Sequence, residues 1–311
     1  MSAGGGRKAV LAAMFANAGI SVTKLVAFFF SGSASMLSEA IHSIADTLNQ
    51  GLLLVGASQA KRQVTADRPF GYGRLRYIAA FVVAIVLFLG GGVFSMVEGV
   101  HKWQHPQFDA KAAWLPIVVL VVALVLESFS LRTALVEARE ARGDMSLARF
   151  IRVTRQPELP VVLLEDLGAL LGLVFALAAV VLSLVTGDGR YDGAGAVAIG
   201  ILLIVVAVIL FIELFSMLIG ESALPELESA IHQAVKRHSF LGDVIHLRTA
   251  HMGPEELLVG IKVAVDPQSL SIDVARAVDE VEAEIRQQVP IARWIYIETD
   301  VLDPTRVTAT D

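Results

Sequence analysis

The chain has 311 residues, of which 55% are hydrophobic and only 18% are charged, and its mean hydropathy is +0.65. A soluble domain does not carry this much apolar material in long runs, so the composition predicts a membrane protein. The formal net charge of -6 leaves no basic footprint for a nucleic acid. The chain has no cysteine, which excludes disulfides and thiolate metal ligands, so any metal would be held by imidazole nitrogen and oxygen.

Six apolar segments are long enough to cross the hydrocarbon core of a bilayer as helices, which takes roughly 20 residues. Helices are expected because they satisfy their own backbone hydrogen bonds, and because the alternation of a transmembrane β-barrel is missing. The segments are 8–30, 36–58, 77–100, 114–134, 161–186 and 194–218. We therefore predict a membrane α-helical fold, with a six-helix transmembrane domain over residues 1–218.

The distribution of Lys and Arg sets the orientation of these segments. Thirteen basic residues lie at the N-terminus and in the connections after the second and fourth segments. The other side has three: Lys102, Lys111 and Arg190. Both termini are therefore predicted to be cytoplasmic. Within the connection from the fourth to the fifth segment, apolar residues at helical spacing predict a short amphipathic helix at the membrane surface: Leu147, Phe150, Ile151 and Val153.

After Gly220 the pattern becomes that of a small soluble domain. Residues 221–238 have helical character and residues 244–252 resemble a strand, while alternate residues from Leu257 to Val265 are apolar, as in a half-buried strand. A second helix and a strand over 291–301 follow. The α-β-β-α-β order over residues 219–311 predicts an α+β domain with its helices on one face of a sheet, located in the cytoplasm.

The second apolar segment carries a stripe of polar side chains. Four of them follow one another at spacings of three, four and three residues, which place them on one face of a helix: Glu39, His42, Asp46 and Asn49. Ionisable groups are costly in hydrocarbon unless they are paired or face a protein-lined cavity, so the stripe predicts a functional site. His42 and Asp46 are close enough to hold one metal ion, and Glu39 and Asn49 are expected to support them or to line the entrance.

Few other acids lie at membrane depth. Glu165 and Asp166 are adjacent in the fifth segment, and Glu127 lies in the fourth. Adjacent helical residues point about 100° apart, so we expect one of the pair to be a ligand and the other its neighbour or a proton carrier. Ligands from this helix would complete a tetrahedral site that Zn²⁺ accepts. For Glu127 two alternatives stay open: a proton-linked or packing role, or no role. The plain alternative is that all these groups only hydrogen-bond helices together.

Such a site indicates transport. Imidazole and carboxylate ligands bind metal only when deprotonated, so loading releases protons, and His42 is the natural titrating group because its unperturbed pKa is about 6.5. We hypothesise that a divalent cation moves one way and protons the other. Two alternatives are an intramembrane metal-dependent hydrolase and a scaffold that binds metal without moving it. The missing H-E-x-x-H and G-x-S-x-G motifs count against an enzyme.

Several motifs resemble those of a known family. Residues 17–24 (NAGISVTK), 31–33 (SGS), 37–46 (LSEAIHSIAD) and 69–74 (PFGYGR) match the first two helices and the following loop of the cation diffusion facilitator family. Within that family the chain resembles the branch of the vertebrate zinc transporter number nine, through residues 76–78 (RYI), the long fourth-to-fifth connection and residues 161–166 (VVLLED). The resemblance covers all six segments and, more weakly, the C-terminal domain.

The resemblance implies a homodimeric exporter of divalent metal that works by proton antiport, with a ferredoxin-like cytoplasmic domain in each subunit. It also implies two metal ligands from the second helix, matched by His42 and Asp46, and two from the fifth. Asp166 matches one of the second pair, but the other falls on Val162, which cannot bind metal. Glu165 or a water molecule is expected to take that place.

Histidine with carboxylates suits Zn²⁺, while Mn²⁺, Fe²⁺, Co²⁺ and Cd²⁺ are further candidate cargoes, and no prosthetic group is expected. In the cytoplasmic domain, Lys262, Ala275 and Glu298 stand where many relatives have metal-binding histidines. That domain is therefore expected to serve dimerisation, although four groups remain available: His238, Asp243, His246 and His251. The protein is expected to be a multi-pass protein of the plasma (inner) membrane.

Overall fold

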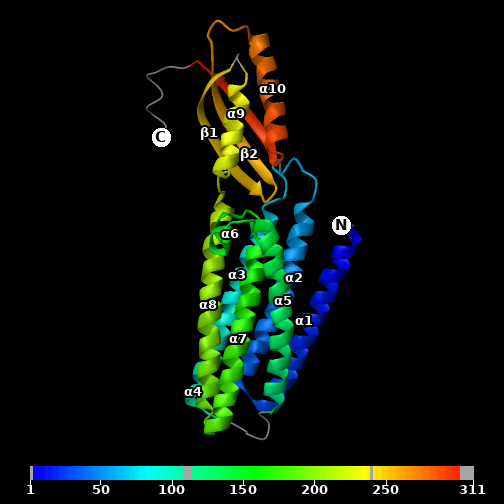
Figure 1. The fold of residues 1–311 in the computed structure, drawn as a ribbon, viewed down its shortest axis with the longest axis vertical. Helices are drawn as coiled ribbons and strands as arrows, with labels where there is room; N and C mark the ends of the chain where they lie inside the picture. The colour runs from blue at the N-terminus through cyan, green and yellow to red at the C-terminus, as the bar shows by residue number, and fades with distance from the viewer. Residues whose placement is uncertain (1–2, 108–113, 239–240, 302–311) are drawn as a thin grey trace. The chain divides into compact units, whose positions relative to one another are not determined.

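The computed structural model describes residues 3–107, 114–238 and 241–301, with side chains from residue 17 onward. Lys111 and residues 302–311, which entered the predictions of orientation and domain extent, lie outside the described residues. The chain forms two compact units (Figure 1). The first comprises Met1–Ser58 and Arg76–Phe215, and the second Gln59–Leu75 and Ser216–Asp311. The connection 59–75, placed in the transmembrane domain by the sequence, thus groups with the C-terminal unit.

The first unit is a bundle of long helices (Figure 1). All six predicted segments are helical. The helices are α1 (Ala3–Ser31), α2 (Ala34–Ala60), α3 (Leu75–Val86), η1 (Leu87–Val93), α4 (Phe94–Gln104), α5 (Trp114–Arg142), α7 (Glu158–Thr186) and α8 (Arg190–Ile219). Among the described residues, four helices are long and apolar enough to cross a membrane: the continuous Leu75–Gln104, α5, α7 and α8. That α1 and α2 also cross the membrane stays a prediction; the polar stripe of α2 lowers its hydropathy.

The third predicted segment is not a uniform α-helix. Its middle, η1, is π-helical, and this stretch contains three consecutive glycines at 90–92. A Cβ on Gly92 would lie 2.5 Å from Cγ1 of Ile204 on α8, so glycine allows the two helices to approach closely. Hydrophobic periodicity does not reveal the extra residue of a π-turn, which is why the sequence predicted a plain helix.

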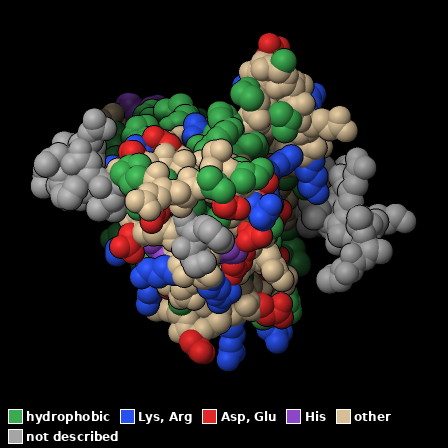
Figure 2. All heavy atoms as spheres, turned by 90° about the horizontal axis from the view of Figure 1, so that it is seen from above, with side chains coloured by type: hydrophobic (Ala, Val, Ile, Leu, Met, Phe, Trp, Pro, Cys, Tyr) green, Lys and Arg blue, Asp and Glu red, His purple; other side chains and the backbone are tan. Residues whose placement is uncertain are grey.

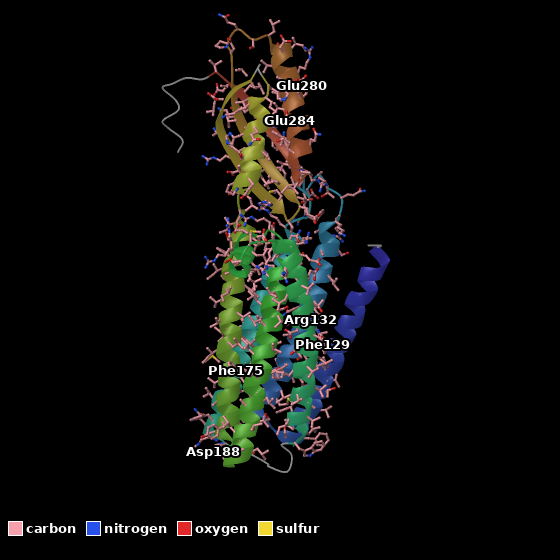
Figure 3. The ribbon with its side chains drawn as sticks, in the orientation of Figure 1. Phe129, Arg132, Phe175, Asp188, Glu280 and Glu284 are labelled. Carbon is pink, nitrogen blue, oxygen red and sulfur yellow. The ribbon has the colours of Figure 1, made fainter. Side chains whose placement is uncertain are left out.

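The helices expose large apolar side chains along their outer faces. Phe29, Phe129 and Val185 are 77%, 61% and 78% exposed in the isolated chain, and Figure 3 labels Phe129 on α5. Soluble monomers rarely expose apolar surface on this scale. The exposure fits contact with lipid.

A short helix, α6 (Leu147–Val153), forms in the connection between α5 and α7, as the apolar spacing predicted. The Ser146 hydroxyl caps its start by accepting from the Arg149 N–H. Phe150 is buried against Ala134 on α5 and Leu163 on α7. The predicted helix is confirmed, while its location at the membrane surface stays a prediction.

The second unit is a small α+β domain in the predicted α-β-β-α-β order. Its elements are α9 (Pro225–Lys236), β1 (Leu241–Gly253), β2 (Glu256–Val265), α10 (Ser271–Gln288) and β3 (Ala292–Asp300). The sheet order is β1-β2-β3, with β1 and β2 antiparallel and β2 and β3 parallel. The alternate β2 residues from Leu257 to Val263 are buried in one core with Ile231 of α9 and Val281 of α10, so both helices cover the same face.

The connection 59–75 packs within this second unit. The ring of Phe70 meets that of Trp294 edge-on, with centroids 5.7 Å apart. A Cβ on Gly253, the last residue of β1, would lie 2.8 Å from Cα of Gly73, so the two backbones touch.

On the molecular face in Figure 2, acidic and basic side chains are interspersed.

Candidate metal centre

The start of α2 is fixed by hydrogen bonds to its first turn. A helix leaves its first four N–H groups without intrahelical partners. Here the Asp192 carboxylate, from the first turn of α8, accepts from the N–H groups of Ala34 at 2.6 Å and Ser35 at 3.1 Å, and from the Ser33 hydroxyl at 2.7 Å. The Ser33 side chain and carbonyl accept from the next two N–H groups. All four are satisfied, so the position of the α2 stripe is tied to α8.

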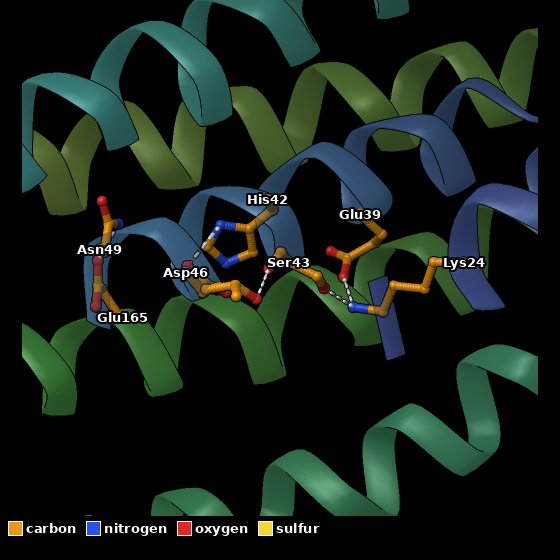
Figure 4. A network of polar contacts seen from close by, with 8 residues as sticks. Lys24, Glu39, His42, Ser43, Asp46, Asn49 and Glu165 are labelled. Atoms are coloured by element: carbon orange, nitrogen blue, oxygen red, sulfur yellow. Dashed lines mark hydrogen bonds and ion pairs between the residues drawn. The ribbon is translucent and has the colours of Figure 1, made fainter. Parts of the chain in front are cut away.

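The four stripe residues lie on one face of α2 within the bundle (Figure 4). Glu39, His42 and Asn49 are fully buried, and the Asp46 side chain is 14% exposed. His42 Nδ1 lies 3.4 Å from Asp46 Oδ1, the i,i+4 arrangement that the sequence predicted. His42 Nε2 has no hydrogen-bond partner. A buried imidazole nitrogen without a partner is available to a ligand.

The two adjacent acids of α7 point to different helices. Glu165 accepts from Asn49 Nδ2 of α2 at 2.6 Å and is buried, with 5% of its surface exposed. Asp166 accepts from the Ser130 hydroxyl of α5 at 2.9 Å. This divergence follows from the helical step of about 100°. Of the pair, Glu165 makes the direct contact with the α2 stripe.

Val162 lies away from the stripe, because it packs against the apolar cluster formed by α5, α6 and α7. Asp166 follows it four positions later, so the two share the side of α7 that faces α5. The valine thus completes a hydrophobic contact, while Glu165 carries the carboxylate nearest to α2.

A small cavity adjoins the stripe. It measures about 10 Å³, roughly the room of one water molecule, and its lining includes Asp46 of α2 and Glu127 of α5. Asp46 also lies close enough to Glu127, Glu165 and Asp166 for their charges to interact. Four carboxyl groups therefore share one region at membrane depth, which favours occupation by a cation or by protons.

The side chains are not assembled into a closed metal site in this conformation. Across the described ranges, no three His, Asp or Glu side chains are grouped closely enough to hold an ion. The pairs His42–Asp46 and Asn49–Glu165 are formed, and Asp166 is directed to α5. The ligand set of His42, Asp46, Asp166 and Glu165 therefore stays a prediction that requires a rearrangement of side chains.

Sequence reasoning missed one charged member of the network, Lys24 of α1. Its ammonium is fully buried, 3.1 Å from Glu39 Oε2 and 2.6 Å from Ser43 Oγ (Figure 4). The available signal was a single lysine in the middle of an apolar segment, 16 residues after the previous basic residue. Such a lysine needs a buried partner, and Glu39 is that partner.

Gly172 of α7 makes room for a side chain of the stripe. A Cβ at this position would lie 2.5 Å from Glu39 Oε1. The missing side chain therefore leaves room for the second oxygen of Glu39, which has no hydrogen-bond partner.

In the C-terminal unit, one of the four available groups, His238, pairs with carboxylates of α10. His238 lies 3.0 Å from Glu284 and 3.4 Å from Glu280, both on α10 (Figure 3). Burial alone would raise the pKa of Glu284, but hydrogen bonds from His238 and Arg237 lower it overall. These contacts join α9 to α10, in keeping with a structural role.

A position on β2 where the resemblance implies a metal-binding histidine is also occupied by a paired residue. Lys262 contacts Glu298 at 2.9 Å and Asp300 at 3.0 Å, both on β3. These hydrogen bonds raise the pKa of Lys262. At this point of the sheet, the two carboxylates that could bind a metal ion are therefore paired with a lysine ammonium.

Comparison with known proteins gives consistent matches. A family model described as the cation efflux transmembrane domain matches residues 10–219. The proton-coupled zinc antiporter SLC30A9, mitochondrial, of Xenopus laevis is 33% identical over 269 residues, which are 85% of this chain and 48% of that protein. Its Homo sapiens counterpart is 36% identical over 222 residues, 70% of this chain and 39% of that protein. The chain spans about half or less of the length of these relatives.

A more distant relative and a solved structure also match. Metal tolerance protein C4 of Arabidopsis thaliana is 28% identical over 254 residues, 80% of this chain and 54% of that protein. The structure of a MamM CTD in a nickel form covers 26% of this chain and 100% of its own, at 18% identity and a TM-score of 0.24.

Proposed function

Because the chain belongs to the cation efflux family, whose members are transporters and not enzymes, we propose that it carries Zn²⁺ across a membrane in exchange for protons. A divalent metal cation is the substrate class of this family. Zinc as the cargo and proton coupling are supported by the names of relatives that are 33% and 36% identical. Both are proposals for this chain, which matches only part of those proteins.

The observation that carries the proposal is the buried pairing of the α2 stripe with an acid of α7. His42 and Asp46 share one face of α2, and Glu165 reaches the same face through Asn49. Polar and ionisable groups at membrane depth are expensive and mark ion pathways. A stripe that only joined helices would not leave a fully buried histidine with an unpartnered ring nitrogen.

We assign the side chains as follows. His42 and Asp46 hold the ion from α2, and Glu165 and Asp166 supply carboxylate oxygen from α7 after rotating toward the centre. The imidazole nitrogen and the carboxylate oxygens lose their protons when metal binds. The site therefore exchanges protons for a metal ion. Glu127, on the cavity beside Asp46, is placed to carry a proton, and Asn49 orients Glu165.

The oligomeric state and the membrane are further parts of the proposal. A homodimer is what the family resemblance implies, and cross-linking in membranes would test it. The expected plasma (inner) membrane finds no support in the comparisons, because the names of the SLC30A9 relatives place those proteins in mitochondria. Fractionation of the native membranes would assign the location.

Metal flux into sealed proteoliposomes tests the function. With zinc outside, an internal zinc indicator and an internal pH indicator should report zinc accumulating beyond the amount of protein present while protons leave. His42→Ala should abolish both signals. The matched variant His101→Ala, at an exposed α4 histidine, should retain them.

Two results would contradict the proposal. Zinc bound only in proportion to protein would indicate a metal-binding scaffold. Zinc flux that neither changed the internal pH nor responded to an imposed pH gradient would remove proton exchange.

A further inference from the structure

A lysine ammonium lies fully buried inside the helix bundle. Lys24 Nζ contacts Glu39 Oε2 and Ser43 Oγ, and all three side chains are buried. A charge at this depth carries a large desolvation penalty, and a good partner offsets that penalty only in part. Because an apolar residue would hold α1 against α2 at least as well, the ion pair calls for a reason beyond packing.

The pair lies at a defined point along α2. That helix starts at the turn containing Ser33, and Glu39 precedes His42 by three residues. The Lys24–Glu39 contact therefore stands between this turn and the His42–Asp46 pair. Figure 1 shows the α1–α2 and α7–α8 turns at the same end of the bundle, here called the turn end. In the predicted orientation, the turn end faces away from the cytoplasm.

The charge of Lys24 acts on the site itself. His42, Asp46 and Glu127 all lie within electrostatic range of its ammonium. A cation passing between the site and the turn end would meet this fixed positive charge, and would find one oxygen of Glu39 already occupied. Like charges in a region of low dielectric repel strongly. The Lys24–Glu39 contact therefore opposes the passage of a cation at this point of the bundle.

The remaining contacts of Glu39 show what release would expose. Its second oxygen, Oε1, has no partner and rests in the space that Gly172 leaves open on α7. Once freed from Lys24, this carboxylate would present two oxygens between three helices, α1, α2 and α7. Glu39 would then become an acceptor on the exit path.

We propose that Lys24 is a gating residue, which keeps the turn end of the transport path closed by holding Glu39. This inference rests on the proposed transport function for its purpose. The closed contact itself is a property of α1 and α2 alone.

The absence of cysteine provides a direct test. Ser38→Cys places a single thiol at a buried position beside Glu39, where the native hydroxyl has no partner. Sealed vesicles are exposed to a membrane-impermeant thiol reagent from each side in turn, without metal. In this background Lys24→Met should raise the labelling rate from the turn end at least about fivefold, the lower limit of typical coupling between states. Labelling from the opposite side should not rise.

Two further variants separate gating from folding. Glu39→Gln should also raise labelling, and the double variant Lys24→Met/Glu39→Gln should exceed neither single variant by more than about twofold, because both remove one interaction. The matched control is Lys102→Met, which removes a lysine bonded to the Gly32 carbonyl at 2.7 Å, outside the stripe. It should leave labelling within about twofold of the background.

Specific outcomes would overturn the proposal. It fails if Lys24→Met and the double variant elute as monodisperse protein and label no faster than the background. It also fails if labelling rises equally from both sides, since that would indicate general loosening. The labelling needs no zinc, so failed zinc uptake by the unmodified chain would refute the transport function and leave the gate standing.

Discussion

Replacing Asp192 with alanine should destabilise the bundle more than any other single loss at the turn end. The carboxylate is 2% exposed and accepts two N–H bonds and one hydroxyl bond at the start of α2. Its removal leaves two buried N–H groups unsatisfied, at about 1–3 kcal/mol each. The lost charge at the helix N-terminus adds about 0.3–1 kcal/mol. We expect Asp192→Ala to lower the free energy of unfolding by about 2–7 kcal/mol.

Asp192→Asn should lose less, about 1–3 kcal/mol, because an amide retains one acceptor oxygen while losing the charge. Denaturant unfolding in detergent, with equal slopes for all variants, measures these differences. The control is Asp188→Ala in the neighbouring turn, where the carboxylate is only half-buried and accepts from the Arg190 N–H rather than from the start of α2. Equal stability of the Asp192→Ala and Asp188→Ala proteins would refute the argument that this carboxylate fixes the start of α2.

Two further substitutions test contacts in each unit. Gly172→Ala places a Cβ 2.5 Å from Glu39 Oε1, so it should lower zinc uptake and reduce the free energy of unfolding by about 1–3 kcal/mol. Gly51→Ala on the same type of helix has open space around its Cβ, so it should leave zinc uptake unchanged and cause no loss of stability. The lowered pKa of Glu284 means that its contribution to stability is present above the unfolded-state pKa of about 4.3 and is lost as the pH falls through the lower folded-state pKa. Below about pH 4.3, acidification should therefore increase the hydrogen-exchange rate in α10 more in the wild type than in Glu284→Gln. Identical pH profiles of the two proteins would contradict this.

Much of the fold follows from local pattern. The six apolar segments and the amphipathic α6 could be predicted as helices from their length and periodicity, which can be recognised without knowing any tertiary contact. The alternation around Val259 likewise located β2. The π-turn of η1 was missed, because one extra residue per turn hardly disturbs the apolar run. The grouping of 59–75 with the second unit depends on contacts such as Phe70 with Trp294, which lie far apart in sequence.

The candidate site was predictable only in part. His42 and Asp46 were found because they lie four residues apart on one helix. Lys24 was overlooked, since its meaning depends on Glu39 of another helix. The role of Asp192 could not be predicted, because its carboxylate caps a helix that starts 158 residues earlier. Helical geometry showed that the acids of α7 diverge, but which one faces α2 depended on how that helix is rotated in the bundle.

The most direct test of the account is zinc uptake by Glu165→Gln in proteoliposomes, measured beside Glu98→Gln, the same substitution on α4. Glu165 is the α7 carboxylate in contact with the α2 stripe, so its loss should slow uptake at least about tenfold, as expected when a group that holds or orients a metal is removed. Glu98→Gln should stay within about twofold of the wild type. Wild-type uptake by Glu165→Gln would contradict the account and remove Glu165 from the transport site.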